Sequence, residues 1–136
     1  MILLDTSVLI DMAQGRPVSP AARAALTTAA QSGQLWMSAI SGWELGLIAT
    51  RTGRTGPQLG DPRRFLPELI RRAGLKVAAL DLDIALASAW LPTPFHTDPA
   101  DRLLVATARA MDATLATSDR RILTYADAGH VRALAC

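Results

Sequence analysis

The sequence has 136 residues, half of them hydrophobic and 19% charged, which suits one globular domain spanning residues 1–136 and excludes a disordered chain. No uninterrupted apolar run reaches the roughly 18 residues that a membrane span needs, and the apolar start carries Asp5 and Asp11 without a basic lead-in, so we expect neither a membrane protein nor a signal peptide. The only cysteine, Cys136, excludes an intrachain disulfide and a cysteine-based zinc cluster, and a reducing, cytoplasmic setting is the simplest inference.

The net charge of +2 is unevenly distributed along the chain. Residues 51–76 hold seven basic and two acidic residues, a balance of +5, which leaves −3 for the remainder. A basic middle segment could form a nucleic-acid-contacting edge beside a cluster of carboxylates. A solvated arginine face on one helix would give the same pattern, so charge alone leaves both interpretations open.

Short apolar strands alternate with helices along the whole chain. In order, we expect a strand at 2–5, a helix from Ser19-Pro20 to Gly33, a strand at 35–37, and a helix capped by Ser38 or Ser41 that runs to about 51. A Gly-rich loop at 52–60, a helix at 61–73, a strand at 76–80, a short helix from 81 or 83 to before 92, and a helix at 98–111 follow. The predicted series ends with a strand at 113–117, a turn over 118–123 and an edge strand at 130–134. This alternation predicts an α/β fold, a three-layer α/β/α sandwich around a central, mainly parallel sheet.

Glu44 is out of place in the segment SAISGWELGLIA, residues 38–49. On a helix it shares a row with Ile40, Leu47 and Ile48, at the spacing of a buried stripe. A buried carboxylate is rare unless it is paired or bound to metal, and the neighbouring turns hold no Lys or Arg before Arg51. The pattern therefore predicts a partner for Glu44 elsewhere in the chain.

Further carboxylates are predicted at the same end of the sheet. Asp5 follows the first strand and Asp119 follows the fourth, and ligands gather at the carboxyl ends of parallel strands. Each of these could instead cap the next turn or helix. Asp101 begins an apolar stripe on the helix after Asp98, and its placement in the first turn, where an acid favours the helix dipole, explains it only in part. Asp98 itself, followed by proline, is well explained as an N-cap.

Four clustered acids would repel one another and raise one another's pKa values unless a cation neutralised them. Oxygen ligands without cysteine and with few histidines favour a hard ion, Mg²⁺ or Mn²⁺, and water bound to such an ion can attack a phosphodiester. Hydroxyl groups follow the first acid and precede the last, and they could orient the carboxylates. These hydroxyls belong to Thr6, Ser7, Thr117 and Ser118.

Four segments in order, MILLDTSVLI, SAISGWELGLIA, FHTDPADRLLVATA and ATLATSDRRIL, resemble the PIN-domain ribonucleases, and most of all the VapC-type toxins of bacterial toxin–antitoxin pairs. The similarity covers residues 1 to about 123. It implies a PIN-like sandwich whose metal-binding and catalytic acids correspond to Asp5, Glu44, Asp101 and Asp119. It also implies metal-dependent hydrolysis of RNA, a homodimer, and inhibition by a cognate antitoxin protein.

The roles of three further residues of this pattern stay open. Asp98 could cap its helix, assist metal binding, or do both. Arg102 could contact a phosphate or pair with a nearby acid. His96 could act as a general base, although an exposed loop histidine is the simpler interpretation. The arginines at 51–72 could guide RNA toward the acidic pocket.

Three alternatives to this function remain. Aspartyl-phosphate phosphatases also begin with a strand and an aspartate, but they need a second aspartate where this chain has Ser7. A catalytically idle PIN-like domain would serve as an RNA-binding or scaffold module, yet such modules usually lack one or more of the four acids. A nuclease that acts on DNA, or one outside toxin–antitoxin pairs, fits the same residues.

Overall fold

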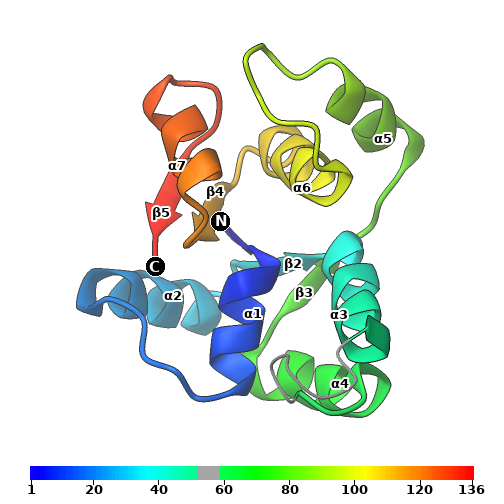
Figure 1. The fold of residues 1–136 in the computed structure, drawn as a ribbon. Helices are drawn as coiled ribbons and strands as arrows, with labels where there is room; N and C mark the ends of the chain where they lie inside the picture. The colour runs from blue at the N-terminus through cyan, green and yellow to red at the C-terminus, as the bar shows by residue number, and fades with distance from the viewer. Residues whose placement is uncertain (52–58) are drawn as a thin grey trace.

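The structure, a computed structural model, describes residues 1–51 and 59–136, and over these residues the chain forms one five-stranded parallel sheet in the order β3-β2-β1-β4-β5 (Figure 1). The strands are β1 (Ile2–Leu4), β2 (Leu35–Ser38), β3 (Lys76–Ala78), β4 (Thr114–Thr117) and β5 (Ala133–Ala135). The helices between them are α1 (Thr6–Ala13), α2 (Pro20–Gln31), α3 (Ala39–Arg51), α4 (Pro62–Ala73), α5 (Leu82–Ala89), α6 (Pro99–Ala110) and α7 (Arg120–Asp127). The predicted three-layer α/β/α fold is confirmed.

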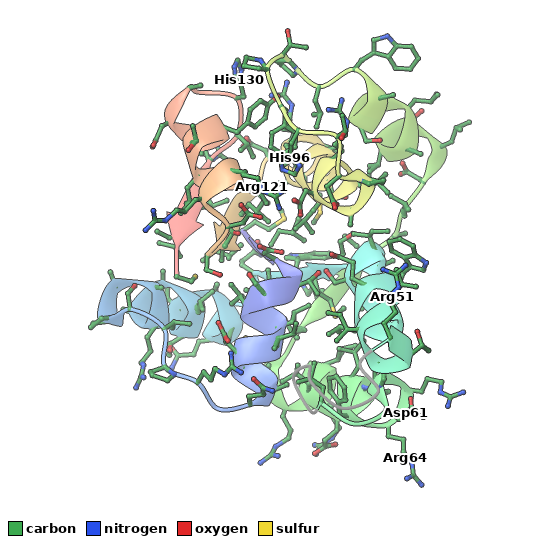
Figure 2. The ribbon with its side chains drawn as sticks, in the orientation of Figure 1. Arg51, Asp61, Arg64, His96, Arg121 and His130 are labelled. Atoms are coloured by element: carbon green, nitrogen blue, oxygen red, sulfur yellow. The ribbon has the colours of Figure 1, made fainter. Side chains whose placement is uncertain are left out.

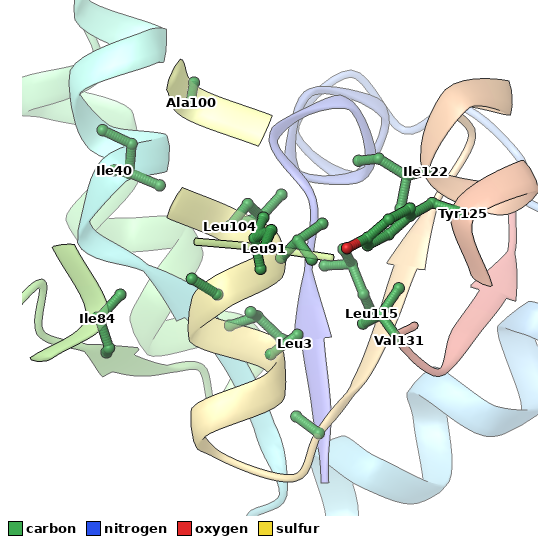
Figure 3. Close-up of a cluster of buried hydrophobic side chains, with 14 residues drawn as sticks. Leu3, Ile40, Ile84, Leu91, Ala100, Leu104, Leu115, Ile122, Tyr125 and Val131 are labelled. Atoms are coloured by element: carbon green, nitrogen blue, oxygen red, sulfur yellow. The ribbon is translucent and has the colours of Figure 1, made fainter. Parts of the chain in front are cut away.

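The central strand β1 separates two hydrophobic cores. Because successive side chains of a strand point to opposite faces, Leu3 packs with α5, α6 and α7, whereas Leu4 packs with α1, α2 and α4. Leu3, Leu4 and Leu115 of β4 are fully buried, and each contributes about 1.5–3 kcal/mol to stability. Figure 3 shows the first core, with Leu104 of α6 and Tyr125 of α7 packed beside Leu3. The middle of the sheet is therefore the best-anchored part of the fold.

Caps and breaks explain where several helices begin and end. Ser19 accepts a hydrogen bond from the Ala22 amide at the start of α2, and Asp81 does the same for Ile84 at the start of α5. Gly74 ends α4 in the left-handed conformation, with φ of 63°, which costs glycine little. No helix in residues 1–51 and 59–136 is long and apolar enough to cross a membrane.

Three predicted boundaries are wrong. No element was expected at residues 6–13, where α1 forms, and only a turn was expected where α7 begins. Both helices have eight residues, too few for periodicity to identify them, and the equally short α5 was predicted from an aspartate at its start, whereas Asp5 and Asp119 were interpreted mainly as site acids. The last strand starts at Ala133 rather than at residue 130, because Ala133 is the first residue opposite β4, through Leu115. Most of the predicted Gly-rich loop, residues 52–58, lies outside the described residues.

Candidate functional site

The carboxyl ends of β1 and β4 meet at the middle of the sheet and bring Asp5 beside Thr117. The two strands are parallel neighbours, and the Asp5 amide donates a hydrogen bond of 2.9 Å to the carbonyl of Ala116. The Asp5 side chain, only 6% exposed, accepts from the hydroxyls of Thr117 and Ser7 on its Oδ2 atom. The Ser118 hydroxyl in turn lies 3.2 Å from Ser7 Oγ. The four predicted hydroxyl residues thus all lie at this edge, and two of them hold Asp5.

Glu44 comes to the same edge from α3 and is held by the fourth hydroxyl. Thr6 Oγ1 donates to Glu44 Oε2 at 2.5 Å and also lies 2.9 Å from Ser41 Oγ. Ile40, Ser41 and Leu45 form the buried face of α3, and Glu44 is half-buried at its margin. Burial raises the pKa of Glu44, and the negative charges of Asp5 and Asp98 raise it further, while the Thr6 hydrogen bond opposes them.

The two acids of the α6 start have different roles. Asp98 is the N-cap, and its Oδ1 atom accepts from the amides of Ala100 at 3.0 Å and Asp101 at 3.2 Å. Asp101 points inward, and its side chain is 14% exposed. Burial raises the pKa of Asp101 to about 7, with the charges of Asp98, Asp5 and Asp119 as further causes. An acid so perturbed by its neighbours is typical of a functional site.

Asp119 caps α7 and is paired with a residue that sequence reasoning missed. Its Oδ1 atom accepts from the Arg121 amide at 2.7 Å, and its Oδ2 atom lies 2.8 Å from the Arg121 guanidinium. The same guanidinium donates to Asp101 Oδ2 at 3.2 Å. Hydrogen bonds from Arg121 are the main reason that the pKa of Asp119 is lowered. The spacing Asp-x-Arg at a helix start was the signal available in the sequence, but it pointed only to Asp119.

His96 lies in the site rather than on an exposed loop, so the simpler interpretation of this histidine is wrong. Its side chain is 20% exposed, its ring packs on Phe95, and its Nε2 atom lies 3.2 Å from Asp101 Oδ2. That distance permits an ion pair, although the angle does not form a hydrogen bond. Burial, and then the positive charge of Arg121, lower the pKa of His96 and favour the neutral imidazole. Figure 2 shows His96 and Arg121 close together.

Arg102 makes no ion pair with an acid among the described residues, and its guanidinium instead binds backbone carbonyls. Its guanidinium donates to three backbone carbonyls: Ser88 at 2.9 Å, Ala89 at 3.2 Å and His96 at 3.2 Å. These bonds tie the end of α5 and the loop before α6 to α6 itself. Arg102 therefore holds the segment that carries His96.

A groove runs along α3 from Glu44 toward Arg51. It has a volume of about 370 Å³ and is lined by Trp43, Glu44, Arg51, Asp98 and nearby apolar residues. Figure 2 shows Arg64 of α4 at the other end of the molecule from Arg121. Arg51 is thus the residue of the basic segment that lies beside the acids, whereas Arg54 falls outside the described residues.

Donor chemistry and charge at this edge fit a hard divalent cation. Asp5, Glu44, Asp101 and Asp119 supply carboxylate oxygens, and the negative charges of neighbouring aspartates help to raise the pKa values of Glu44 and Asp101. A positive group, the Arg121 guanidinium, already lies between two of them. In the described part of the chain, no three acidic, histidine or cysteine side chains are grouped as a ready metal cluster. Metal binding would therefore require the carboxylates of Asp101 and Asp119 to exchange one cation for another.

Comparison with solved structures agrees with this fold. The VapBC2 crystal structure from Rickettsia felis, bound to a DNA fragment from their promoter, is 18% identical with a TM-score of 0.73, over 100% of this chain and 99% of that one. The DNA-bound VapBC from Salmonella typhimurium is 18% identical with a TM-score of 0.65, over 98% and 96%. A toxin–antitoxin complex from Klebsiella pneumoniae is 20% identical with a TM-score of 0.58, over 90% of each chain.

No curated protein sequence matches the chain. A family model described as PIN domain matches residues 2–128, which include the strands β1 and β4 and all four candidate acids. The chain therefore belongs to the PIN domain family.

Proposed function

We propose that the protein is a metal-dependent endoribonuclease that acts as the toxin of a toxin–antitoxin pair. Membership of the PIN domain family supports a nuclease, a hydrolase that acts on nucleic acid. The observation that carries the proposal is Asp101, an inward-facing carboxylate whose pKa is raised to about 7 by burial and by the charges of three other aspartates. Such a cluster of acids is expected where a bound divalent cation offsets the negative charge of the carboxylates and of an anionic substrate.

Asp5, Asp101 and Asp119 would hold the Mg²⁺ or Mn²⁺ ion, and Glu44 would complete the ligand set or orient a water molecule. The ion supplies an activated water and offsets charge on the phosphate oxygens. Thr117 and Ser7 fix the Asp5 carboxylate, and Thr6 fixes Glu44, by the hydrogen bonds described above. Asp98 begins α6 and so orients Asp101. These contacts would limit the movement of the Asp5 and Glu44 carboxylates and of the start of α6 before a ligand binds.

His96 and Arg51 would act on the substrate side of this site. His96 favours the neutral form, and its Nδ1 atom accepts from the Asp98 amide at 3.4 Å, so the proton is on Nε2. His96 would therefore donate a hydrogen bond from Nε2 into the site without adding a charge that repels a cation. Arg51 lies in the groove beside Glu44, where a guanidinium would bind a phosphate of the RNA strand. Arg63, Arg71 and Arg72 of α4 are paired with Asp61 or Glu68 and would add only long-range attraction.

The partners we propose are RNA, a cognate antitoxin and a second copy of the chain, in the cytoplasm. Similarity to the Klebsiella pneumoniae toxin–antitoxin complex supports an antitoxin. The solvent-facing side of α5 supports a protein partner of some kind, because Leu82 and Trp90 are 72% and 77% exposed and Leu86 is 49% exposed.

The deciding experiment is cleavage of matched RNA and DNA oligonucleotides by the parent protein, Asp5→Asn and Asp101→Asn, with Mg²⁺ or Mn²⁺ or with EDTA. We expect RNA cleavage that needs the metal and falls at least about 100-fold in both variants, since each removes a carboxylate from the ion. Asp127→Asn, at an exposed position on α7, is the matched control and should cleave like the parent. Equal cleavage by all four proteins would refute the assignment of Asp5 and Asp101 to the site. Cleavage of DNA alone would refute RNA as the substrate. No cleavage of RNA or DNA would favour a catalytically idle module.

A further inference from the structure

Arg121 repeats a local arrangement that also occurs far from the site. In α4 the N-cap Asp61 accepts from the Arg63 amide at 2.9 Å and from the Arg63 guanidinium at 2.7 Å. In α7 the N-cap Asp119 accepts from the Arg121 amide at 2.7 Å and from its guanidinium at 2.8 Å. An arginine two residues after an N-cap aspartate therefore folds back on that aspartate by itself, and this contact alone does not indicate a function.

The second contact of Arg121 is what distinguishes the two arrangements. Its guanidinium reaches Asp101 Oδ2 at 3.2 Å, on another helix and 20 residues away in sequence. Arg63 is bonded only to Asp61 in the described part of the chain. The Arg121 guanidinium therefore lies between Asp101 and Asp119 because of how α6 and α7 pack, and not because of the local Asp-x-Arg motif.

The carboxylates that share this guanidinium are two of the proposed metal ligands. Their side chains are 14% and 23% exposed, whereas the Arg121 side chain is 58% exposed. The positive group thus approaches the acids from the solvent side. A divalent ion held by the carboxylates of Asp101 and Asp119 would compete with the Arg121 guanidinium, because two positive groups at the same pair of acids would repel each other.

We propose that Arg121 is a built-in counter-ion that competes with the divalent metal for Asp101 and Asp119 and so sets the metal affinity of the site. This inference rests on the proposed function for the identity of the metal ligands. Arg121 can leave without unfolding anything, because its side chain is long, exposed and held by partly exposed ion pairs of the kind that are individually weak. Its release needs only rotation about side-chain bonds, while the Asp119 cap of α7 stays in place through the Arg121 amide.

The test is a calorimetric titration of the metal-free protein with Mn²⁺, without nucleic acid, on the parent, Arg121→Gln and Arg120→Gln. We expect Arg121→Gln to bind Mn²⁺ about tenfold more tightly, equivalent to about 1.4 kcal/mol. Arg120→Gln removes the same charge from the adjacent exposed position and should stay within about twofold of the parent. Glutamine has a helix propensity close to that of arginine, and circular dichroism of each variant checks that α7 is retained.

Arg121→Lys separates geometry from charge. Lysine keeps the positive charge but cannot donate to both carboxylates in the planar fork of arginine, so its Mn²⁺ affinity should lie between those of the parent and Arg121→Gln. Equal affinities of the parent and Arg121→Gln, or an equal gain in Arg120→Gln, would overturn the inference, as would the absence of Mn²⁺ binding in every variant. Tighter Mn²⁺ binding in Arg121→Gln without cleavage of any nucleic acid would refute the proposed nuclease and leave the counter-ion role standing. RNA cleavage together with equal Mn²⁺ affinities of the parent and Arg121→Gln would support the proposed nuclease and refute the counter-ion role.

Discussion

Replacing Asp101 by asparagine should stabilise the metal-free protein at high pH and have little effect at low pH. The folded protein holds the Asp101 proton with a pKa of about 7, above the ordinary value of 3.8 for an aspartate. Because the folded pKa is raised, the ionised group weakens the fold, and stability is lost as the pH rises from about 3.8 through about 7. Asparagine resembles the neutral acid at every pH, so the stability of the variant does not fall in this way as the pH rises.

The magnitude follows from the shift of about three pKa units. At 1.36 kcal/mol per unit this corresponds to an upper value of about 4 kcal/mol. Water at the mouth of the site screens the interaction, and the ion pair with Arg121 is lost in the variant, so we expect about 1–2 kcal/mol at pH 8. For a chain of this length that is a rise in Tm of about 3–7 °C.

Urea unfolding with EDTA at pH 4.5, 6 and 8, followed by circular dichroism, measures the difference directly. The advantage of Asp101→Asn should be about a quarter of its full value at pH 4.5 and about two-thirds at pH 6, and it should level off by pH 8. Asp127→Asn, exposed and without an ion pair in the described residues, should differ little from the parent at any pH. An advantage that does not change with pH, or a variant less stable than the parent at pH 8, would refute the reasoning.

Three other changes probe the same edge of the sheet. Thr117→Val keeps the shape of a fully buried side chain but removes the hydroxyl that donates to Asp5. The free energy of unfolding, measured in urea, should therefore fall by about 1–2 kcal/mol. Thr124→Val, on the exposed surface of α7, is the control. Arg102→Met leaves three carbonyls without their donor and should cost about 2 kcal/mol, together with faster hydrogen exchange in α5; equal exchange in both proteins would show that Arg102 does not hold this helix. Mn²⁺ at about 100 times its Kd should stabilise the parent by about 2.7 kcal/mol in thermal melts and should do much less for Asp119→Asn, and an equal gain in both would place the ion elsewhere.

Periodicity was sufficient to find the two inward acids. Glu44 and Asp101 each interrupt an apolar helical stripe, and a carboxylate there is informative because burial is costly for it. Both prove to be at least half-buried, with raised pKa values. The alternation of strands and helices likewise predicted the sandwich, because parallel strands that are buried on both faces have a recognisable apolar pattern.

Contacts between elements could not be derived in the same way. Whether Arg121 reaches Asp101 depends on how α6 and α7 lie against each other, and no local pattern encodes that distance. His96 was misplaced for a similar reason, since its burial comes from Phe95 and from the loop that Arg102 ties down. The helices α1 and α7 were missed because eight residues hold too few turns for a period to be measured, and because Asp5 and Asp119, unlike Asp81 before α5, were interpreted as site acids rather than as helix caps.

The central pairing of the sheet also determines when the site can exist during folding. β1 and β4 are neighbours, yet Thr117 and the Asp5 that it holds are 112 residues apart in sequence. Contacts of such high contact order form slowly, because the entropy of closing the loop is lost before the contact stabilises the chain. A nascent chain on the ribosome cannot form this pairing until β4 has emerged, by which time α1 to α6 have already been synthesised. Asp119, which follows β4, therefore joins Asp5 at this edge only in the step that pairs β4 with β1.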